Sequence, residues 1–153
     1  MSETIALISD SHRLIRPEVE PYLENAAHVI HAGDVGTYET LKRFEILNPH
    51  TTFVCGNTDY DPGVASLPMV RRLQLFGFSF YVIHDLASAA KGDTTQSDFV
   101  IFGHSHMPET FTRDSTVFIN PGSIGPARFK LPVSLALLII DKNRKWELKF
   151  ITL

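Results

Sequence analysis

The amino-acid sequence predicts an α/β fold, with a parallel sheet in the first half of the chain and a β-rich second half. In the first half, three short apolar runs alternate with two stretches of helical periodicity, an order typical of a parallel sheet. Each run ends in polar or charged residues, as strands do where they deliver side chains to a site. The second half holds pairs of strand-like runs separated by short turns, which indicates hairpins.

Apolar spacing and proline positions define the elements of the first half. Residues 4–10 (TIALISD) predict a buried strand that ends at Asp10. Residues 16–26 (RPEVEPYLENA) predict a helix that begins near Pro17 and is limited in length by Pro21. Two further strands are predicted over 28–34 and 51–59, with a helix over 38–47 that presents Leu41, Phe44 and Leu47 or Ile46 on one face.

The second half is predicted to be built mainly from hairpins. Paired runs lie in 69–85, 109–123 and 134–153, and a further buried strand is predicted over 98–108. Residues 59–68 (DYDPGVASLP) are expected to form a loop, of a length that tends to be functional. The three hairpin turns are expected at Phe76–Gly77, Asp114–Ser115 and Lys142–Asn143.

Length and composition limit the class of protein. The chain has 153 residues, 44% hydrophobic and 20% charged, so we expect a single globular domain over residues 1–153. The net charge of -3 provides no basic field for nucleic acid, and the single cysteine, Cys55, fits a reducing compartment. The first residues do not resemble a secretory signal, and the longest apolar run, Leu135–Ile140, is far shorter than the roughly 20 residues of a membrane helix. A cytoplasmic protein that does not engage a membrane is expected.

Two aspartates, one asparagine and four histidines lie at or just beyond the ends of predicted strands. Oxygen and imidazole ligands together suit Mn, Fe, Zn or Co better than Ca or Mg, and the absence of cysteine from the set argues against a structural zinc site. Seven ligands exceed what one ion needs, whereas two ions that share a carboxylate would use them all. The seven residues are Asp10, His12, Asp34, Asn57, His84, His104 and His106.

Each of these residues has an ordinary structural explanation when it is considered alone. Asp10 and Asp34 could cap helices, Asn57 could occupy a turn, and His84 could be a packed histidine. The joint occurrence of all seven at strand ends is what favours a metal centre. In the strand predicted over 98–108, Gly103 is expected to let the backbone turn sharply before the two histidines, His104 and His106.

The ordered pattern DSH…GD…GN…H…GHSH, followed by NPGS at 120–123, resembles the calcineurin-like metallophosphoesterases, and within them the small bacterial and archaeal phosphodiesterases. The resemblance covers residues 5 to about 125. It implies a metallophosphoesterase-like β-sandwich of two mixed sheets flanked by helices, in four αββα layers. It also implies that Asp10, His12 and His106 hold one metal, that Asn57, His84 and His104 hold a second, and that Asp34 bridges both.

The activity implied by this resemblance is hydrolysis of a small phosphodiester by a hydroxide that bridges two divalent ions. Mn²⁺ is the expected metal, with Zn²⁺, Fe²⁺, Co²⁺ or Ni²⁺ as alternatives, and Asp34, Asn57 and His104 are the expected catalytic residues. His31 is expected to support Asp34 from outside the ligand set. Two alternatives remain open: a phosphomonoesterase on the same site, and an interaction scaffold of the same fold with little catalysis.

The sequence departs from the family pattern at two positions. Thr58 stands where many larger members have a histidine thought to protonate the leaving oxygen, so activated aryl diesters are expected to be cleaved far better than alkyl ones. Asp85 stands where glycine is more common, and it could accept a hydrogen bond from a ligand histidine or repel an anionic substrate.

Substrate contacts are expected from Arg13, Thr58 and Arg128, the polar groups nearest to the motifs in the sequence. No motif for nucleotides or nucleic acids is present. A homodimer remains open, because the exposure of apolar residues in the second half is not known from sequence.

Overall fold

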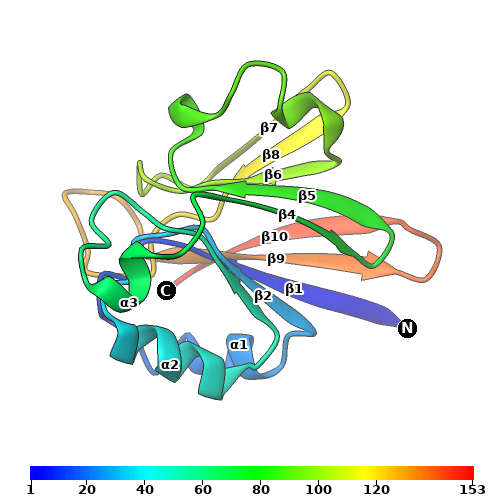
Figure 1. The fold of residues 1–153 in the computed structure, drawn as a ribbon. Helices are drawn as coiled ribbons and strands as arrows, with labels where there is room; N and C mark the ends of the chain where they lie inside the picture. Colours follow the sequence, from blue (N-terminus) through cyan, green and yellow to red (C-terminus); the bar gives the residue numbers. More distant parts are fainter.

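The computed structural model describes residues 1–153 and consists of two stacked five-stranded sheets (Figure 1). The first sheet has the strand order β10-β9-β1-β2-β3 and comprises β1 (Ser2–Ile8), β2 (His28–His31), β3 (Thr51–Phe53), β9 (Ser134–Asp141) and β10 (Trp146–Thr152). The second has the order β4-β5-β6-β8-β7 and comprises β4 (Val70–Leu75), β5 (Phe78–Ile83), β6 (Phe99–Ile101), β7 (Glu109–Arg113) and β8 (Thr116–Asn120).

Both sheets are mixed. Strands β1, β2 and β3 are parallel, as predicted, and β5, β6 and β8 are also parallel to one another. The last hairpin joins the first sheet, because β9 pairs antiparallel with β1. The apolar run of β9 explains this position: Ala136 and Leu138 face the second sheet, while Leu135 and Leu137 face the helices. A strand with two apolar faces is stable only inside a sheet that is covered on both sides.

The helices pack on the outer face of the first sheet (Figure 1). Helix α2 (Tyr38–Leu47) has the predicted bounds, and the side chain of Thr37 caps it by accepting the backbone N–H of Thr40. Helix α1 (Glu20–Glu24) is shorter than predicted, since a proline near its start and the absence of a side-chain cap confine it to five residues. None of the helices has the length and apolar character needed to cross a membrane.

The segment 59–68, predicted as a loop, contains one short helix, α3 (Pro62–Ala65). Pro62 can occupy the first turn of a helix at no cost in hydrogen bonds, and the side chain of Asp61 accepts the N–H of Gly63. These two residues supply the start signal that the loop prediction missed.

Three apolar layers hold the molecule together. The central layer lies between the sheets, and the second lies between the first sheet and the helices. On the outer face of the second sheet, Leu86 and Ala89 cover a third cluster that contains Tyr81 and Phe118. Leu86 belongs to η1 (Leu86–Ser88), which together with η2 (Thr94–Gln96) lies in the segment between β5 and β6. The expected metallophosphoesterase-like sandwich is therefore confirmed, with 3₁₀ turns in its fourth layer.

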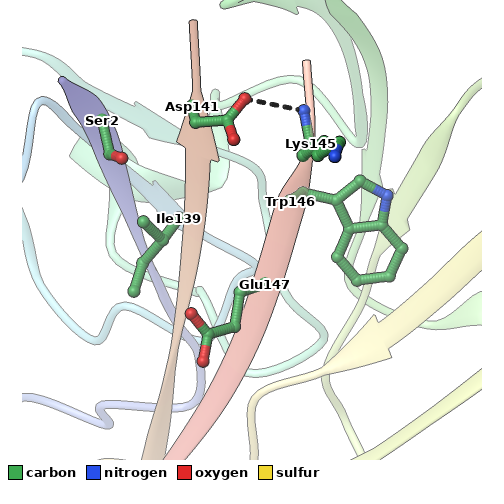
Figure 2. A pocket seen from close by; sticks show the side chains of 6 residues that line it. All are labelled: Ser2, Ile139, Asp141, Lys145, Trp146 and Glu147. Atoms are coloured by element: carbon green, nitrogen blue, oxygen red, sulfur yellow. Dashed lines mark hydrogen bonds between the residues drawn. The ribbon is translucent and has the colours of Figure 1, made fainter. Parts of the chain in front are cut away.

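The hairpin turns lie where the sequence predicts them. Phe76 and Gly77 have φ values of 51° and 86°, and Asp114 and Ser115 have values of 50° and 69°, as a type I′ turn requires at both central residues. Asp141 organises the last hairpin by accepting the N–H of Lys145 (Figure 2). The shallow pocket shown there includes Ser2, the first residue of β1, so it lies at the opposite end of the first sheet from Asp10.

Phe44 is expected to be the main anchor of α2. Its ring is 1% exposed and lies 5.1 Å from the His31 ring, whereas Ile46 on the same helix is 82% exposed. Phe44→Ala should lower the free energy of unfolding by about 3–5 kcal/mol, because it leaves a cavity. Ile46→Ala should change it by less than about 0.5 kcal/mol. Urea unfolding of both variants measures this difference, and similar values for the two would contradict the packing described here.

Candidate metal centre

The structure brings all seven candidate ligands together at one edge of the two sheets. Asp10 and His12 follow β1, Asp34 follows β2 and Asn57 follows β3, all from the first sheet. The remaining three come from the second sheet, where His84 follows β5 and both His104 and His106 follow β6. This is the carboxyl edge of the parallel strands, where sites in α/β proteins form.

One cluster consists of Asp10, His12 and His106. The Nε2 atoms of the two histidines are 3.4 Å apart. Oδ1 of Asp10 lies 3.3 Å from Nε2 of His106 and 3.7 Å from Nε2 of His12. Three ligand atoms of a type suited to a transition metal therefore face one point.

A second cluster forms around the side-chain oxygen of Asn57. This oxygen lies 2.9 Å from Nε2 of His84 and 3.1 Å from Nδ1 of His104. Asp34 lies between the two clusters, because its Oδ2 is 3.2 Å from Nε2 of His84 and 3.7 Å from Nε2 of His12. Asp34 and His84 also form a group with Asp10 in which one ligand atom from each lies within 4.8 Å of the others. The division of the seven side chains between two metals, with Asp34 as the bridge, stays a prediction.

Most of these residues have a left-handed backbone, which costs non-glycine residues free energy and persists only where the surroundings enforce it. Such conformations concentrate at functional sites. The residues concerned are Asp10 (φ 56°), His12 (45°), Asp34 (58°), His104 (75°) and His106 (64°). The turn after β6 is thus made by the histidines themselves. Gly103 has a different role from the expected one: a Cβ atom there would collide with Ser9 and Asp10.

The carboxylate of Asp10 fits a bound cation. Its Oδ2 accepts hydrogen bonds from the Ser9 hydroxyl at 2.6 Å and from the His104 N–H at 3.2 Å. Its Oδ1 is buried and has no hydrogen-bond partner, and it is the atom that faces His12 and His106. A buried carboxylate oxygen without a donor is costly, and a metal ion at this point would remove that cost.

Charge interactions keep both carboxylates ionised despite their burial. Burial alone would raise the pKa of Asp10, but the nearby rings of His106 and His12, together with the charge of His84, outweigh it and hold that pKa far below its usual range. Burial is likewise outweighed at Asp34, where hydrogen bonding and charge from His84 lower the pKa. The charged forms that bind metals are therefore the stable ones.

His84 presents a defined nitrogen to the centre. Its Nδ1 donates to the carbonyl oxygen of Ala32 at 2.7 Å, which leaves Nε2 directed toward Asp34 and Asn57. Burial would lower the pKa of the ring, but its interactions with Asp34 and Asp10 raise it above its usual value. A proton and a metal ion would therefore compete for the same nitrogen.

Asp59 is a structural residue that the sequence analysis missed. Its Oδ2 accepts the N–H of Gly56 at 2.8 Å and that of Asp34 at 3.0 Å, and its Oδ1 accepts the N–H of Gly36 at 3.0 Å. One buried carboxylate thus fixes the loops that carry Asp34 and Asn57. The available signal was its place at the end of the GNTD block, directly after a ligand and Thr58.

Residues of the NPGS block fix the opposite side of the site. The side-chain amide of Asn120 donates to the Gly103 carbonyl oxygen at 3.0 Å and to the Ser105 hydroxyl at 3.1 Å. The Ser123 hydroxyl donates to the Asp10 carbonyl oxygen at 3.0 Å. The block therefore holds the two metal-site loops by hydrogen bonds and does not itself enter either cluster.

His31 does not support Asp34 by a hydrogen bond, because the hydrogen bonds of its ring go to Gly33 and Ser11. The N–H of Gly33 donates to Nδ1 of His31 at 3.1 Å, so the ring proton resides on Nε2. That proton is donated to the Ser11 hydroxyl at 2.9 Å, and Ser11 in turn donates to the Val35 carbonyl oxygen at 2.8 Å. Complete burial lowers the pKa of this imidazole to about 3.

The three predicted substrate contacts have different positions. Arg13 is exposed and lines an open cavity with His12 and Thr58. The backbone N–H of Thr58 donates to Oδ1 of Asp34 at 2.8 Å. Arg128 is exposed on a loop and does not line this cavity.

Asp85 does not accept a hydrogen bond from a candidate ligand histidine. Its side chain accepts the N–H of Ala87 and so caps η1.

Asp59→Asn should destabilise the protein by about 1–3 kcal/mol, because an amide group would face backbone N–H donors that now bind a carboxylate. Asp61→Asn is the matched control, since Asn caps a helix as well as Asp does, and we expect a change below about 0.5 kcal/mol. Urea unfolding of the metal-free proteins measures both effects. Equal midpoints for the two variants would show that the three N–H bonds to Asp59 are dispensable.

His31 should make the metal-free protein less stable in acid. Between its folded pKa of about 3 and its usual value of 6.5, the unfolded chain binds a proton at this ring that the folded protein excludes. Stability contributed by the neutral ring is therefore lost as the pH falls through this window, by on the order of 2 kcal/mol from pH 7 to pH 5. Urea unfolding at both pH values should show a smaller loss in His31→Gln than in His50→Gln, which alters an exposed histidine. An identical loss would refute this role.

Three solved structures resemble the chain over nearly its whole length. A phosphodiesterase from an archaeon has a TM-score of 0.80 at 24% identity, with 98% of this chain and 99% of that chain covered. A predicted phosphoesterase of Streptococcus pneumoniae has a TM-score of 0.75 at 25% identity, with 99% and 90% covered. Vps29 of Entamoeba histolytica, in complex with Zn²⁺, has a TM-score of 0.72 at 20% identity, with 97% and 98% covered.

The sequence profile of the calcineurin-like phosphoesterase superfamily domain matches residues 4–143. This range includes all seven clustered side chains, most of β1 and the whole of β2 to β9. The chain therefore belongs to the calcineurin-like phosphoesterase superfamily.

Proposed function

We propose that the protein is a metal-dependent phosphodiesterase that uses two divalent ions, with Mn²⁺ as the ion bound in the cell. The observation that carries the proposal is the buried Oδ1 of Asp10, which faces His12 and His106 without a hydrogen-bond donor. The position of Asp34 between the two clusters supports a second ion beside the first. Asp10, His12 and His106 would hold one ion, Asn57, His84 and His104 the other, and Asp34 would bridge them.

The reaction is the hydrolysis of one ester bond. The bound ions would lower the pKa of a water molecule and would neutralise the negative charge on the phosphate oxygens. The water oxygen forms a bond to phosphorus and the P–O bond to one ester arm breaks. The departing oxygen takes up the proton that the water loses, so the products are an alcohol and a phosphomonoester. Among the seven candidate ligands, Asn57 and His104 are exposed, so both could contact the phosphate of a bound substrate.

Proton donation to the departing oxygen is the weak step of this site. Thr58 lies beside His12, with its Oγ1 3.4 Å from Nδ1 of that histidine, and it offers a hydroxyl in place of the imidazole common in larger relatives. A hydroxyl group is a poor acid near neutral pH, and proton donation by a matched acid typically contributes about 10²–10⁴-fold. Substrates with good leaving groups, such as aryl esters, are therefore the favoured class.

The alternative is an interaction scaffold of the same fold. It has support from the likeness to Vps29, which is named as a vacuolar protein sorting protein, and that likeness concerns the fold. The structure of this chain favours the enzyme, because a scaffold has no need for buried carboxylates, strained ligand residues and a complete set of seven converging side chains.

The decisive experiment measures the release of p-nitrophenol from bis(p-nitrophenyl) phosphate and from p-nitrophenyl phosphate. Metal-stripped protein should be inactive, and Mn²⁺ should restore cleavage with preference for the diester. Asp34→Asn should lower the rate by at least about 10²-fold, since it removes the shared charge, while Asp61→Asn should retain the wild-type rate.

Other outcomes of this assay decide between the alternatives. Preference for p-nitrophenyl phosphate would identify a phosphomonoesterase on the same site. No turnover with Mn²⁺, Zn²⁺, Fe²⁺, Co²⁺ or Ni²⁺ would contradict the enzyme and favour the scaffold. Full activity of Asp34→Asn would contradict the bridging role of this residue.

A further inference from the structure

Two cavities adjoin the seven clustered side chains, and their walls differ in chemistry. The first, here called the apolar cavity because apolar atoms make up most of its exposed wall, has a volume of about 200 Å³. Its lining includes Cys55, Met69, Ile83, Asn57, His84 and Asp85. The second, the polar cavity, has a volume of about 270 Å³ and is walled by His12, Arg13, Gly36, Thr58 and Tyr60. Each cavity thus includes residues of the candidate metal site.

The pairing of β4 with β5 forms the apolar cavity. Val70 pairs with Ile83, so Met69, one residue earlier, lies across from His84. A hydrogen bond of 2.9 Å from the N–H of Cys55 to the carbonyl oxygen of Pro68 holds this segment against the end of β3. Met69 is 64% exposed although it faces a candidate ligand. Methionine is an adaptable apolar residue that gains when a ligand covers it.

An anionic group is disfavoured in the apolar cavity. No lysine or arginine lines it, whereas Asp85 does, and the side chain of Asp85 accepts a hydrogen bond from the Ala87 N–H. The volume is below the roughly 300–1,000 Å³ of pockets for larger ligands. A neutral apolar group of the size of one ring or a short chain fits this space.

The polar cavity favours an anionic group. The Arg13 guanidinium is exposed and makes no hydrogen bond or ion pair, so it is free to bind a carboxylate or phosphate. The hydroxyl of Thr58 and the ring of Tyr60, which is 81% exposed, complete the wall. Such a wall would bind a polar arm by its charge and its hydrogen-bonding groups.

The two cavities lie on different sides of the site. Asn57 and His84, from the second cluster, wall the apolar cavity, whereas His12, from the first cluster, walls the polar cavity. A phosphate held by both clusters would direct one ester arm into each cavity. We propose that the substrate is an unsymmetrical phosphodiester with one neutral, apolar arm and one anionic arm. This inference rests on the proposed phosphodiesterase function and adds the class of substrate.

Two esters that share a p-nitrophenyl arm test the proposal, one with an ethyl and one with a 2-carboxyethyl second arm. With Mn²⁺-loaded wild-type protein, we expect the KM of the carboxyethyl ester to be about fivefold lower than that of the ethyl ester. A difference of this size is what one exposed ion pair, here with Arg13, can contribute to binding. Arg13→Gln should abolish this ratio, while Arg43→Gln, which alters an exposed arginine on α2, should preserve it. Urea midpoints of both variants establish that they are folded.

Met69→Ser tests the apolar cavity. It should raise the KM of both esters by about fivefold and leave their ratio unchanged, because the shared aryl arm loses apolar contact. Ile46→Ser, at an exposed apolar residue of α2, should leave both KM values unchanged.

The outcomes separate this inference from the proposed function. If the wild-type protein releases p-nitrophenol from both esters with equal KM, or if Arg13→Gln keeps the ratio of the two KM values, the proposal of an anionic arm is wrong. The proposed phosphodiesterase function is retained in that case. An unchanged KM in Met69→Ser overturns the apolar arm alone. No Mn²⁺-dependent release from either ester overturns the phosphodiesterase and the substrate class together.

Discussion

The hydrogen bond from the His104 N–H to the Asp10 carboxylate joins the two sheets at the candidate site. Asp10 follows a strand of the first sheet and His104 follows a strand of the second, so this bond, together with that from His84 to the Ala32 carbonyl oxygen, helps to set the distance between the two halves of the candidate ligand set. It also gives the two oxygens of the Asp10 carboxylate different roles. One oxygen is satisfied by protein donors, and the other is left for the centre of the site. The geometry of both clusters depends on this division.

The arrangement concentrates charge that the folded protein must accommodate. Two carboxylates and three imidazoles meet within a small volume, and of these five side chains only His12 is not fully buried. Backbone donors and neighbouring side chains stabilise the ionised carboxylates, and the left-handed loops hold the ligands in directions that an unconstrained chain would avoid. The free energy for this comes from the three apolar layers, in which aromatic side chains such as Phe44 and Phe80 are almost completely buried. The packed β-sandwich is therefore needed to hold the site residues in their left-handed backbone conformations.

Local signals in the sequence predict a large part of this structure. The apolar face of α2, the turn residues at Phe76–Gly77 and Asp114–Ser115, and the polar residues at strand ends all depend on near neighbours in the chain. The convergence of the seven candidate ligands could be predicted because each follows a strand, and parallel strands end at one edge. The partnership of β9 with β1, the three N–H bonds of Asp59 and the buried position of His31 depend on contacts between distant segments. Spacing along the chain does not encode such contacts. Arg13 and Arg128 look alike in sequence, and only the folded chain distinguishes the arginine in a cavity from the one on a loop.

The place of β9 in the first sheet has a consequence for folding during synthesis on the ribosome. Strand β1 is made first, yet one of its two neighbours, β9, begins at Ser134. Until that segment has left the ribosome, β1 has an unpaired apolar edge and the core between the sheets lacks Ala136, Leu138 and Ile140. The ligand-bearing loops after β1, β2, β3, β5 and β6 are all synthesised before this edge is closed. The nascent chain therefore holds every candidate ligand before it holds the strand that completes their support, and early capture of a metal would precede the final closure of the sheet.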